Sequence, residues 1–196
     1  MALAGWGARG HCGDEVIQMK VAVVYESMFG NTRAIAEAVA SGMASSGGTP
    51  QVSVMPVADA TAAMLGEVDL LVVGGPTHIR RMTSRKTRQM GLEAAGKPPK
   101  PGAQPFELTA GAAGPGISEW LSGLPAAPKG CRAAAFDTRL SYPLAGGAAG
   151  PIARRLRRCG YRVDPAPQGF IVKAAQGPLG TGEQERARAW GASLVR

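Results

Sequence analysis

The sequence is poor in aromatic residues and contains no long apolar run. Aromatic side chains make up 5% of the 196 residues, so a hydrophobic core must consist mainly of Val, Leu, Ile, Met and Ala. No apolar run approaches the roughly 20 residues that a membrane-spanning helix needs. The first 18 residues also lack the apolar segment of a secretory signal. We therefore expect a cytoplasmic protein that does not bind a membrane.

Histidine and cysteine are also scarce. The chain contains 2 His and 3 Cys, and Cys12, Cys131 and Cys159 do not have the spacing of metal ligands. An odd number of cysteines leaves one without a disulfide partner. We therefore expect free thiols in a reducing compartment, and no metal site.

Acidic residues are fewer than basic ones. The 14 Asp and Glu residues against 22 Lys and Arg residues give a net charge of +8, which favours an anionic ligand or partner. However, no helix-turn-helix, zinc-finger or basic-aromatic pattern indicates nucleic-acid binding.

Hydrophobic residues make up 45% of the chain, which is typical of a folded domain. The length is that of one domain, and we expect residues 19–196 to form it. Residues 1–18, which are rich in glycine, are expected to be a flexible extension.

Short apolar runs alternate with amphipathic segments along the domain. The runs predict strands buried on both faces, at residues 21–25, 51–55, 68–73 and 132–136, with a last strand in two pieces at 161–163 and 169–174. Apolar residues spaced by about four predict helices, at residues 33–45, 60–65 and 151–159, with Ser118 capping a short helix and Thr181 capping a final helix that ends near Leu194. Residues 97–116 are expected to be a loop. This alternation favours an α/β fold with a doubly wound, five-stranded parallel sheet and helices on both faces.

The segment Tyr25-Glu-Ser-Met-Phe-Gly-Asn-Thr-Arg33 joins the first predicted strand to the first helix. The first amides of a helix have no intrahelical partner and carry a partial positive charge, so they suit a phosphate. Ser27, Asn31 and Thr32 add donors, and Gly30 allows the backbone to curl around an anion. The segment matches neither G-x-x-x-x-G-K-[ST] nor G-x-G-x-x-G, so neither a nucleoside triphosphatase nor a Rossmann dinucleotide site is indicated. Alternatively, these residues are only turn and cap residues.

This segment resembles the first FMN loop of flavodoxins. It is most similar to the Ser-Met-aromatic-Gly-Asn-Thr string in the flavodoxin modules of flavodiiron proteins. The resemblance implies a flavodoxin-like strand order, 2-1-3-4-5, and an FMN phosphate held by this loop. Phe29 stands where many flavodoxins have Thr, so only its backbone N–H would serve. The implied phosphate-binding residues are Ser27, Met28, Phe29, Gly30, Asn31 and Thr32.

Two further loops carry the resemblance. Gly74-Gly-Pro-Thr-His78 resembles the Gly-x-Pro-Thr loop of flavodoxin-like quinone reductases and flavodiiron modules. This implies that Pro76, Thr77 and His78 line the flavin ring and that Gly75 allows the backbone to approach it closely. His78 would be a hydrogen-bonding wall residue, a cation beside the reduced ring or a proton donor. The third loop follows the fourth strand, and its implied cofactor-binding residues are Asp137, Thr138, Arg139 and Tyr142. Tyr142 would stack on the ring or be a surface aromatic.

A cluster of basic residues follows the second loop. It contains Arg80, Arg81, Arg85, Lys86 and Arg88. Ordinary flavodoxins are acidic, so this cluster suggests an acidic redox protein, the phosphate of a nicotinamide cofactor or an anionic substrate as partner; alternatively, it is a solvated face.

Three functions remain open from the sequence. The first is an FMN-binding redox protein that carries electrons through its flavin. The second is an FMN-dependent NAD(P)H:quinone-type oxidoreductase, and the third is a flavin-free interaction module. No catalytic side chain is evident in the sequence, and two histidines are too few for the metal domain of flavodiiron proteins.

Overall fold

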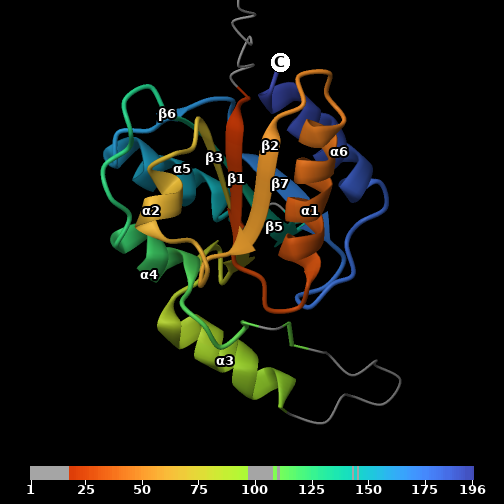
Figure 1. Cartoon of the computed structure of the whole chain (residues 1–196). Coiled ribbons are helices and arrows are strands. Elements are labelled where there is room, and N and C mark those ends of the chain that lie inside the picture. Colours follow the sequence, from red (N-terminus) through yellow and green to blue (C-terminus); the bar gives the residue numbers. More distant parts are fainter. Residues whose placement is uncertain (1–17, 97–107, 110, 143, 145) are drawn as a thin grey trace, which may run out of the picture.

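A computed structural model of the chain describes residues 18–96, 108–109, 111–142, 144 and 146–196. Its central sheet has the order β2-β1-β3-β5, and β6 and β7 pair one after the other with the outer side of β5. These strands are all parallel and confirm the predicted doubly wound fold (Figure 1). Their bounds are β1 (Lys20–Tyr25), β2 (Gln51–Pro56), β3 (Leu70–His78), β5 (Arg132–Leu140), β6 (Arg162–Val163) and β7 (Gln168–Val172). The expected N-terminal extension and most of the expected 97–116 loop lie outside the described residues.

Both faces of the sheet are covered by helices. On one face, Val21 and Val23 of β1 pack against α1 (Asn31–Ala44) and α6 (Glu183–Leu194). On the other face, Ala22 and Val24 belong to the core under α2 (Ala62–Leu65), α4 (Ile117–Ser122) and α5 (Ala149–Arg158). The strands are apolar throughout because consecutive side chains point to opposite faces and both faces are buried. No helix in the described part of the chain is long and apolar enough to cross a membrane.

Two predicted helix caps are wrong. The last helix begins after Gly182 and not at Thr181, and Glu183 of its first turn accepts a hydrogen bond from the Ile171 N–H of β7 at 2.8 Å. The short helix α4 is capped by Gly116 and not by Ser118. The Glu119 side chain reaches back to the Gly116 N–H at 2.9 Å. Glu119 thus satisfies a backbone donor at the start of its own helix, as in a capping box, whereas Glu183 satisfies a donor in the neighbouring strand.

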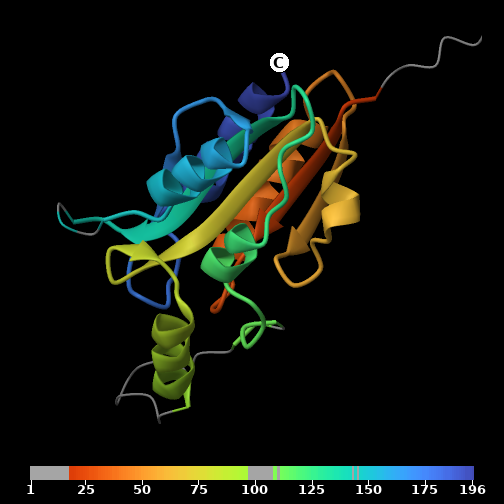
Figure 2. The same ribbon diagram turned by 90° about the vertical axis from the view of Figure 1, so that its left-hand side faces the viewer.

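Two elements between β3 and β5 were not predicted from the sequence. The strand β4 (Arg81–Met82) turns back on the end of β3, and α3 (Arg85–Ala95) follows it. Figure 2 shows α3 extending beyond the edge of the sheet, below the other helices. β4 is too short to give an alternating pattern, and α3 has little apolar surface to mark a buried face. This insertion forms part of the candidate site.

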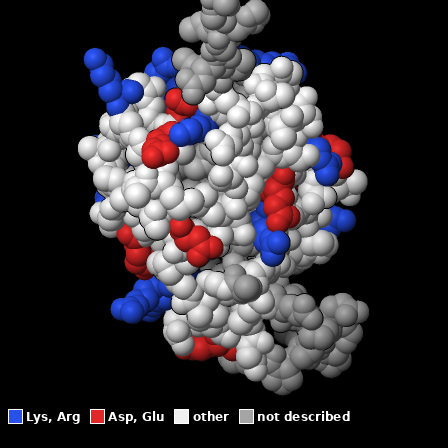
Figure 3. Space-filling model, viewed as in Figure 1, with Lys and Arg blue, Asp and Glu red and all other residues white. Residues whose placement is uncertain are grey.

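Figure 3 shows charged side chains of both signs scattered over one face of the molecule, so the excess of basic residues does not gather into a single patch on that face.

Cys131 and Cys159 are free. Burial raises the pKa of the Cys131 thiol to about 11, which keeps this thiol protonated and unreactive. Cys12 lies outside the described residues.

Candidate functional site

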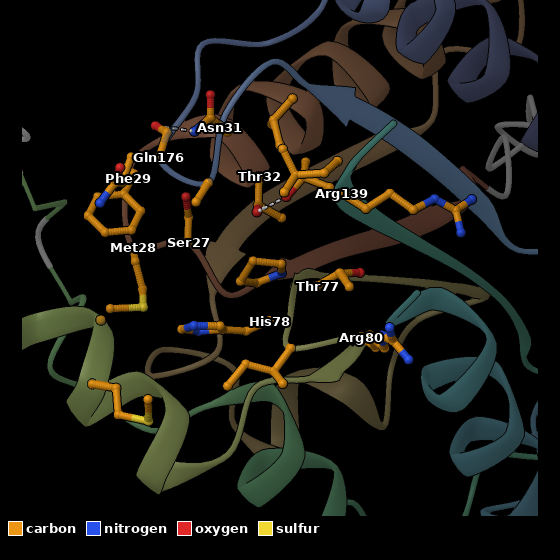
Figure 4. A pocket seen from close by; sticks show the side chains of 18 of the residues that line it. Ser27, Met28, Phe29, Asn31, Thr32, Thr77, His78, Arg80, Arg139 and Gln176 are labelled. Carbon is orange, nitrogen blue, oxygen red and sulfur yellow. Dashed lines mark hydrogen bonds between the residues drawn. The ribbon is translucent and has the colours of Figure 1, made fainter. Parts of the chain in front are cut away.

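A pocket of about 500 Å³ lies at the carboxyl edge of the sheet, where the loops after β1, β3 and β5 meet (Figure 4). This volume is in the range of cofactor and small-molecule sites. All the residues predicted for the site line this pocket except Gly30, Gly75 and Asp137. The predicted residues that do line it are Ser27, Met28, Phe29, Asn31, Thr32, Pro76, Thr77, His78, Thr138, Arg139 and Tyr142.

The first loop exposes the amino terminus of α1 to the pocket. Gly30 caps the helix in a left-handed conformation, with φ of 83°, which favours glycine. The Ala34 N–H donates the first hydrogen bond of the helix to the Gly30 carbonyl at 2.9 Å. The amides of residues 31–33 therefore have no partner within the helix.

Thr109 holds the carbonyl groups of the first loop. Its hydroxyl donates to the Ser27 carbonyl at 2.6 Å, and its N–H donates to the Met28 carbonyl at 2.9 Å. With these acceptors already satisfied, the loop can present donors to a ligand. Sequence analysis missed Thr109, and no local pattern in the predicted 97–116 loop marks it.

The polar side chains at this end of the pocket have different partners. The Ser27 hydroxyl is buried and has no hydrogen-bond partner among the described residues. Thr32 and Thr138 share a hydrogen bond of 2.8 Å between their hydroxyl groups, and Asn31 Nδ2 donates to the Gln176 carbonyl at 2.9 Å (Figure 4). Ser27 is therefore the unsatisfied donor, whereas the Asn31 amide nitrogen holds the chain that follows β7.

The second loop is a tight hairpin. Thr77 pairs with Met82 and His78 with Arg81, which leaves Ile79 and Arg80 as the two turn residues. Their φ angles of 47° and 68° are both in the left-handed region, as a type I′ turn requires. Asn and Gly are the usual residues in such a turn, so this one is strained.

Replacing Ile79 by Asn is expected to stabilise the protein. Asn tolerates the left-handed region, whereas a β-branched residue there costs about 1–2 kcal/mol. Ile79 is 62% exposed, so the substitution removes little packing. We expect a gain of about 1 kcal/mol in the free energy of unfolding, measured by urea denaturation. Ile79→Val, which remains β-branched, is the control and should give no gain; a loss of stability in Ile79→Asn would show that Ile79 makes packing contacts that outweigh the strain.

The position that a side chain on Gly75 would occupy faces α4 and not the pocket. A β-carbon at this position would lie 3.2 Å from Ile117 Cγ2, so the missing side chain makes room for α4 on the face of the sheet and not for a ligand. Gly75 also does not line the pocket.

The ring of His78 is half-buried in the pocket wall. Burial lowers the pKa of His78 below its ordinary value of 6.5, so the imidazole is neutral near pH 7. This favours the wall-residue interpretation over a resident cation. Arg80 and Arg139 supply the positive charge instead, and no Asp or Glu is among the described residues that line the pocket.

Asp137 lies behind the pocket and not in it. Its side chain is fully buried, and its Oδ2 accepts a hydrogen bond from the Ala149 N–H in the first turn of α5 at 2.8 Å. Its Oδ1 lies 3.4 Å from Arg139 Nε. Burial raises the pKa of the Asp137 carboxyl, although these contacts oppose the shift. Asp137 therefore positions α5 and Arg139, and it does not line the pocket; its contact with a cofactor stays a prediction.

Two walls of the pocket were not predicted. The helix α3 contributes Met90 and Gly91, and the chain after β7 contributes Ala175 and Gln176. A β-carbon on Gly91 would lie 2.7 Å from Met28 Cε, so α3 packs directly on the first loop. The remaining unpredicted lining residues are Ile79, Arg80, Leu140 and Val172. Only Arg80 had been singled out in the sequence, as part of the basic cluster.

Glu26 connects the insertion formed by β4 and α3 to the first loop through hydrogen bonds. Its side chain is 6% exposed, and its Oε2 accepts hydrogen bonds from the Ile117 N–H at 2.7 Å and from the Thr83 hydroxyl. Arg88 lies close enough to favour the charged form of Glu26, and Arg88 Nη1 lies 4.0 Å from Glu119 Oε2. Arg88 is itself buried and therefore does not belong to the exposed part of the basic cluster.

The burial of Glu26 predicts a pH dependence of stability. Burial raises the pKa of Glu26 above its ordinary value of 4.5, so the unfolded chain loses this proton at a lower pH than the folded one. Folding stability should therefore fall as the pH rises above 4.5 and through the raised pKa. Glu26→Gln keeps an acceptor oxygen and removes the ionisation. Urea denaturation at several pH values should give a flatter curve for Glu26→Gln than for the wild type, and parallel curves would contradict the assignment.

Comparison with known proteins agrees with the fold and with the first two loops. The flavodoxin family model matches residues 23–91. An archaeal flavodoxin aligns with 24% identity and a TM-score of 0.58, covering 90% of this chain and 96% of its own. Flavodoxin 2 from Bacillus cereus aligns with 16% identity and a TM-score of 0.60, covering 90% of this chain and 97% of its own.

The Flv1 flavodiiron core from Synechocystis aligns with 17% identity and a TM-score of 0.56, covering 90% of this chain but 35% of its own. No curated protein sequence matches significantly. The chain thus has a flavodoxin-like fold, and its first two loops lie within the segment that the flavodoxin family model matches.

Proposed function

We propose that this chain binds one FMN in the pocket and transfers electrons through it. The observation that carries the proposal is the chemistry at the two ends of the pocket. One end holds the free amides of a helix amino terminus and the buried, unpartnered Ser27 hydroxyl, which fit a phosphate dianion. The other end has apolar walls from Met28, Pro76 and Met90, which fit a flat ring. Bound FMN would supply the redox chemistry, and the chain would supply binding, orientation and charge.

At the phosphate end, the residues act as a prearranged cradle. Ser27 and the amides of residues 31–33 would donate to the phosphate, and the left-handed Gly30 shapes the loop for close contact. The linked hydroxyls of Thr32 and Thr138 form the floor beside them. Since Thr109 already holds the carbonyls of the loop, little reorganisation is needed on binding.

At the ring end, the pocket combines apolar contact with positive charge. Met90 and the strained hairpin would exclude water from the ring, and Tyr142, which is 51% exposed, is free to cover it. Arg80 and Arg139 would favour a reduced flavin that carries negative charge. Neutral His78 would offer a hydrogen bond and not a charge.

The visible spectrum of the purified protein tests the proposal directly. We expect a yellow protein with flavin absorbance, or an apoprotein that takes up added FMN with quenching of the flavin fluorescence. A colourless protein that fails to take up FMN would instead support the flavin-free interaction module.

An FMN-dependent oxidoreductase is the second candidate. Arg80 lines the pocket and makes no ion pair with any other described residue, so it is available to an anionic substrate such as a nicotinamide cofactor. Steady-state oxidation of NAD(P)H with a quinone, without an added reductase, would favour this enzyme. A flavin that is readily reduced by chemical reductants but shows no such turnover would favour the carrier.

A further inference from the structure

Three exposed apolar side chains line the pocket, and a fourth lies close to one of them in the sequence. Ile79 and Met90 are 62% and 47% exposed, and Tyr142 and Leu144 are 51% and 65% exposed. Ile79, Met90 and Tyr142 line the pocket, and Leu144 is two residues beyond Tyr142. We refer to these four residues as the apolar rim. Apolar patches around an opening, with charged residues beside them, are typical of interaction sites.

Two exposed cations stand beside this rim. Arg81 pairs with His78 in the hairpin, and Lys86 precedes Met90 by one turn of α3. Neither makes an ion pair with another described residue. By contrast, Arg85 and Arg88 line a different groove, between α3 and residues 113–119. The structure thus divides the basic cluster of the sequence and leaves Arg81 and Lys86, with Arg80, on the side of the pocket.

The hairpin itself indicates that the rim has a role outside the fold. Ile79 is held at a φ of 47° and is largely exposed. A strained residue that gains little burial lowers the stability of the folded chain. Strain of this kind persists where it serves binding or function.

We propose that the apolar rim, with Arg80, Arg81 and Lys86, docks an acidic protein that carries one electron at a time. The inference rests on the proposed FMN site, because it places the partner at the opening through which the flavin would be reached. Each encounter transfers one electron, which the reduced centre of the partner loses and the flavin gains. A protein fits better than a small anion because Arg81 and Lys86 lie outside the pocket and the apolar rim is exposed around it.

The test uses a plant-type [2Fe–2S] ferredoxin as the acidic probe. Reduced ferredoxin is mixed with the FMN-loaded protein, and the rate constant is measured by stopped-flow absorbance at ionic strengths from about 0.01 to about 0.3 M. Isothermal titration calorimetry of oxidised ferredoxin with the protein gives a second readout that needs no flavin. The variant is Arg81→Gln/Lys86→Gln, and neither residue lines the pocket.

The matched control removes two charges elsewhere. Arg158→Gln/Arg162→Gln changes exposed residues at the end of α5 and in β6, which pairs with the start of β5, at the opposite end of the sheet. We expect the wild-type rate constant to fall about tenfold or more as salt rises. The rim variant should be about tenfold slower at low salt, with a flatter salt dependence and weaker binding of ferredoxin, and the control should match the wild type.

Three results would overturn the proposal. One is a rate constant for electron transfer that does not depend on salt. Another is a rate constant that falls equally in the rim variant and in the control variant. The third is a rim variant that loses NADPH oxidation but keeps the ferredoxin rate, which would assign the cations to a small anionic substrate. The absorbance spectrum tests FMN binding, and calorimetry tests ferredoxin docking independently. A protein that shows no flavin absorbance but binds ferredoxin would contradict the proposed FMN site and not the docking surface.

Discussion

Replacing Gly191 by alanine is expected to destabilise the protein by about 1–3 kcal/mol, although alanine is the better helix former. Gly191 lies in α6 where this helix crosses α1, and an added β-carbon would lie 2.1 Å from the Val39 carbonyl oxygen. Gly42 on α1 faces α6 in the same way, with its added β-carbon 2.0 Å from the Arg188 carbonyl oxygen. Because both obstacles are backbone atoms, the two helices would have to move apart.

Urea or thermal denaturation of Gly191→Ala measures this effect. Gly47→Ala is the matched control, since nothing lies within 4 Å of its added β-carbon. The control should be neutral or slightly stabilising, because alanine restricts the unfolded chain. A Gly191→Ala variant as stable as the wild type would show that α1 and α6 do not cross this closely.

Replacing Ser27 by alanine is expected to weaken FMN binding about 10- to 100-fold and riboflavin binding much less. The two ligands differ only in the phosphate, so their difference isolates recognition by the first loop. The Ser27 hydroxyl is buried and has no hydrogen-bond partner among the described residues, so a phosphate would satisfy a donor that is otherwise unpaired. Thr32→Ala should show the same preference with a smaller loss, because Thr32 already shares its hydroxyl with Thr138.

Fluorescence titration of the apoprotein with each flavin provides the measurement. Asn31→Ala serves as the comparison, since Asn31 Nδ2 is bound to the Gln176 carbonyl. Losing this hydrogen bond should make the pocket wall after β7 less rigid, and should weaken the binding of FMN and of riboflavin by similar factors. Equal losses for both flavins in Ser27→Ala would contradict phosphate recognition at this loop.

The interpretation of single residues illustrates how sequence and structure contribute. Gly75 looks like a ligand-binding residue in the sequence, but an added β-carbon there would meet Ile117, and one on the neighbouring Gly74 would meet Phe136. Asp137 stands in the third loop, but its carboxyl faces the start of α5. In both cases the strand direction fixes which face a residue occupies, and no local pattern shows what packs on that face.

The strand order came from the resemblance of the loops to those of flavodoxins, whereas the sequence by itself determined the alternating strands and helices and the position of the first loop. These features follow from local periodicity and from the requirement that parallel strands be buried on both faces. Only the tertiary structure decided which side chains from outside the three predicted loops enter the pocket. Thr109 and Gln176 contact the first loop from distant parts of the chain, and Met90 lines the same pocket. The buried Glu26 binds Thr83, between the hairpin and α3, and Ile117 of α4. Such contacts depend on long-range packing and desolvation, which residue spacing along the chain does not encode.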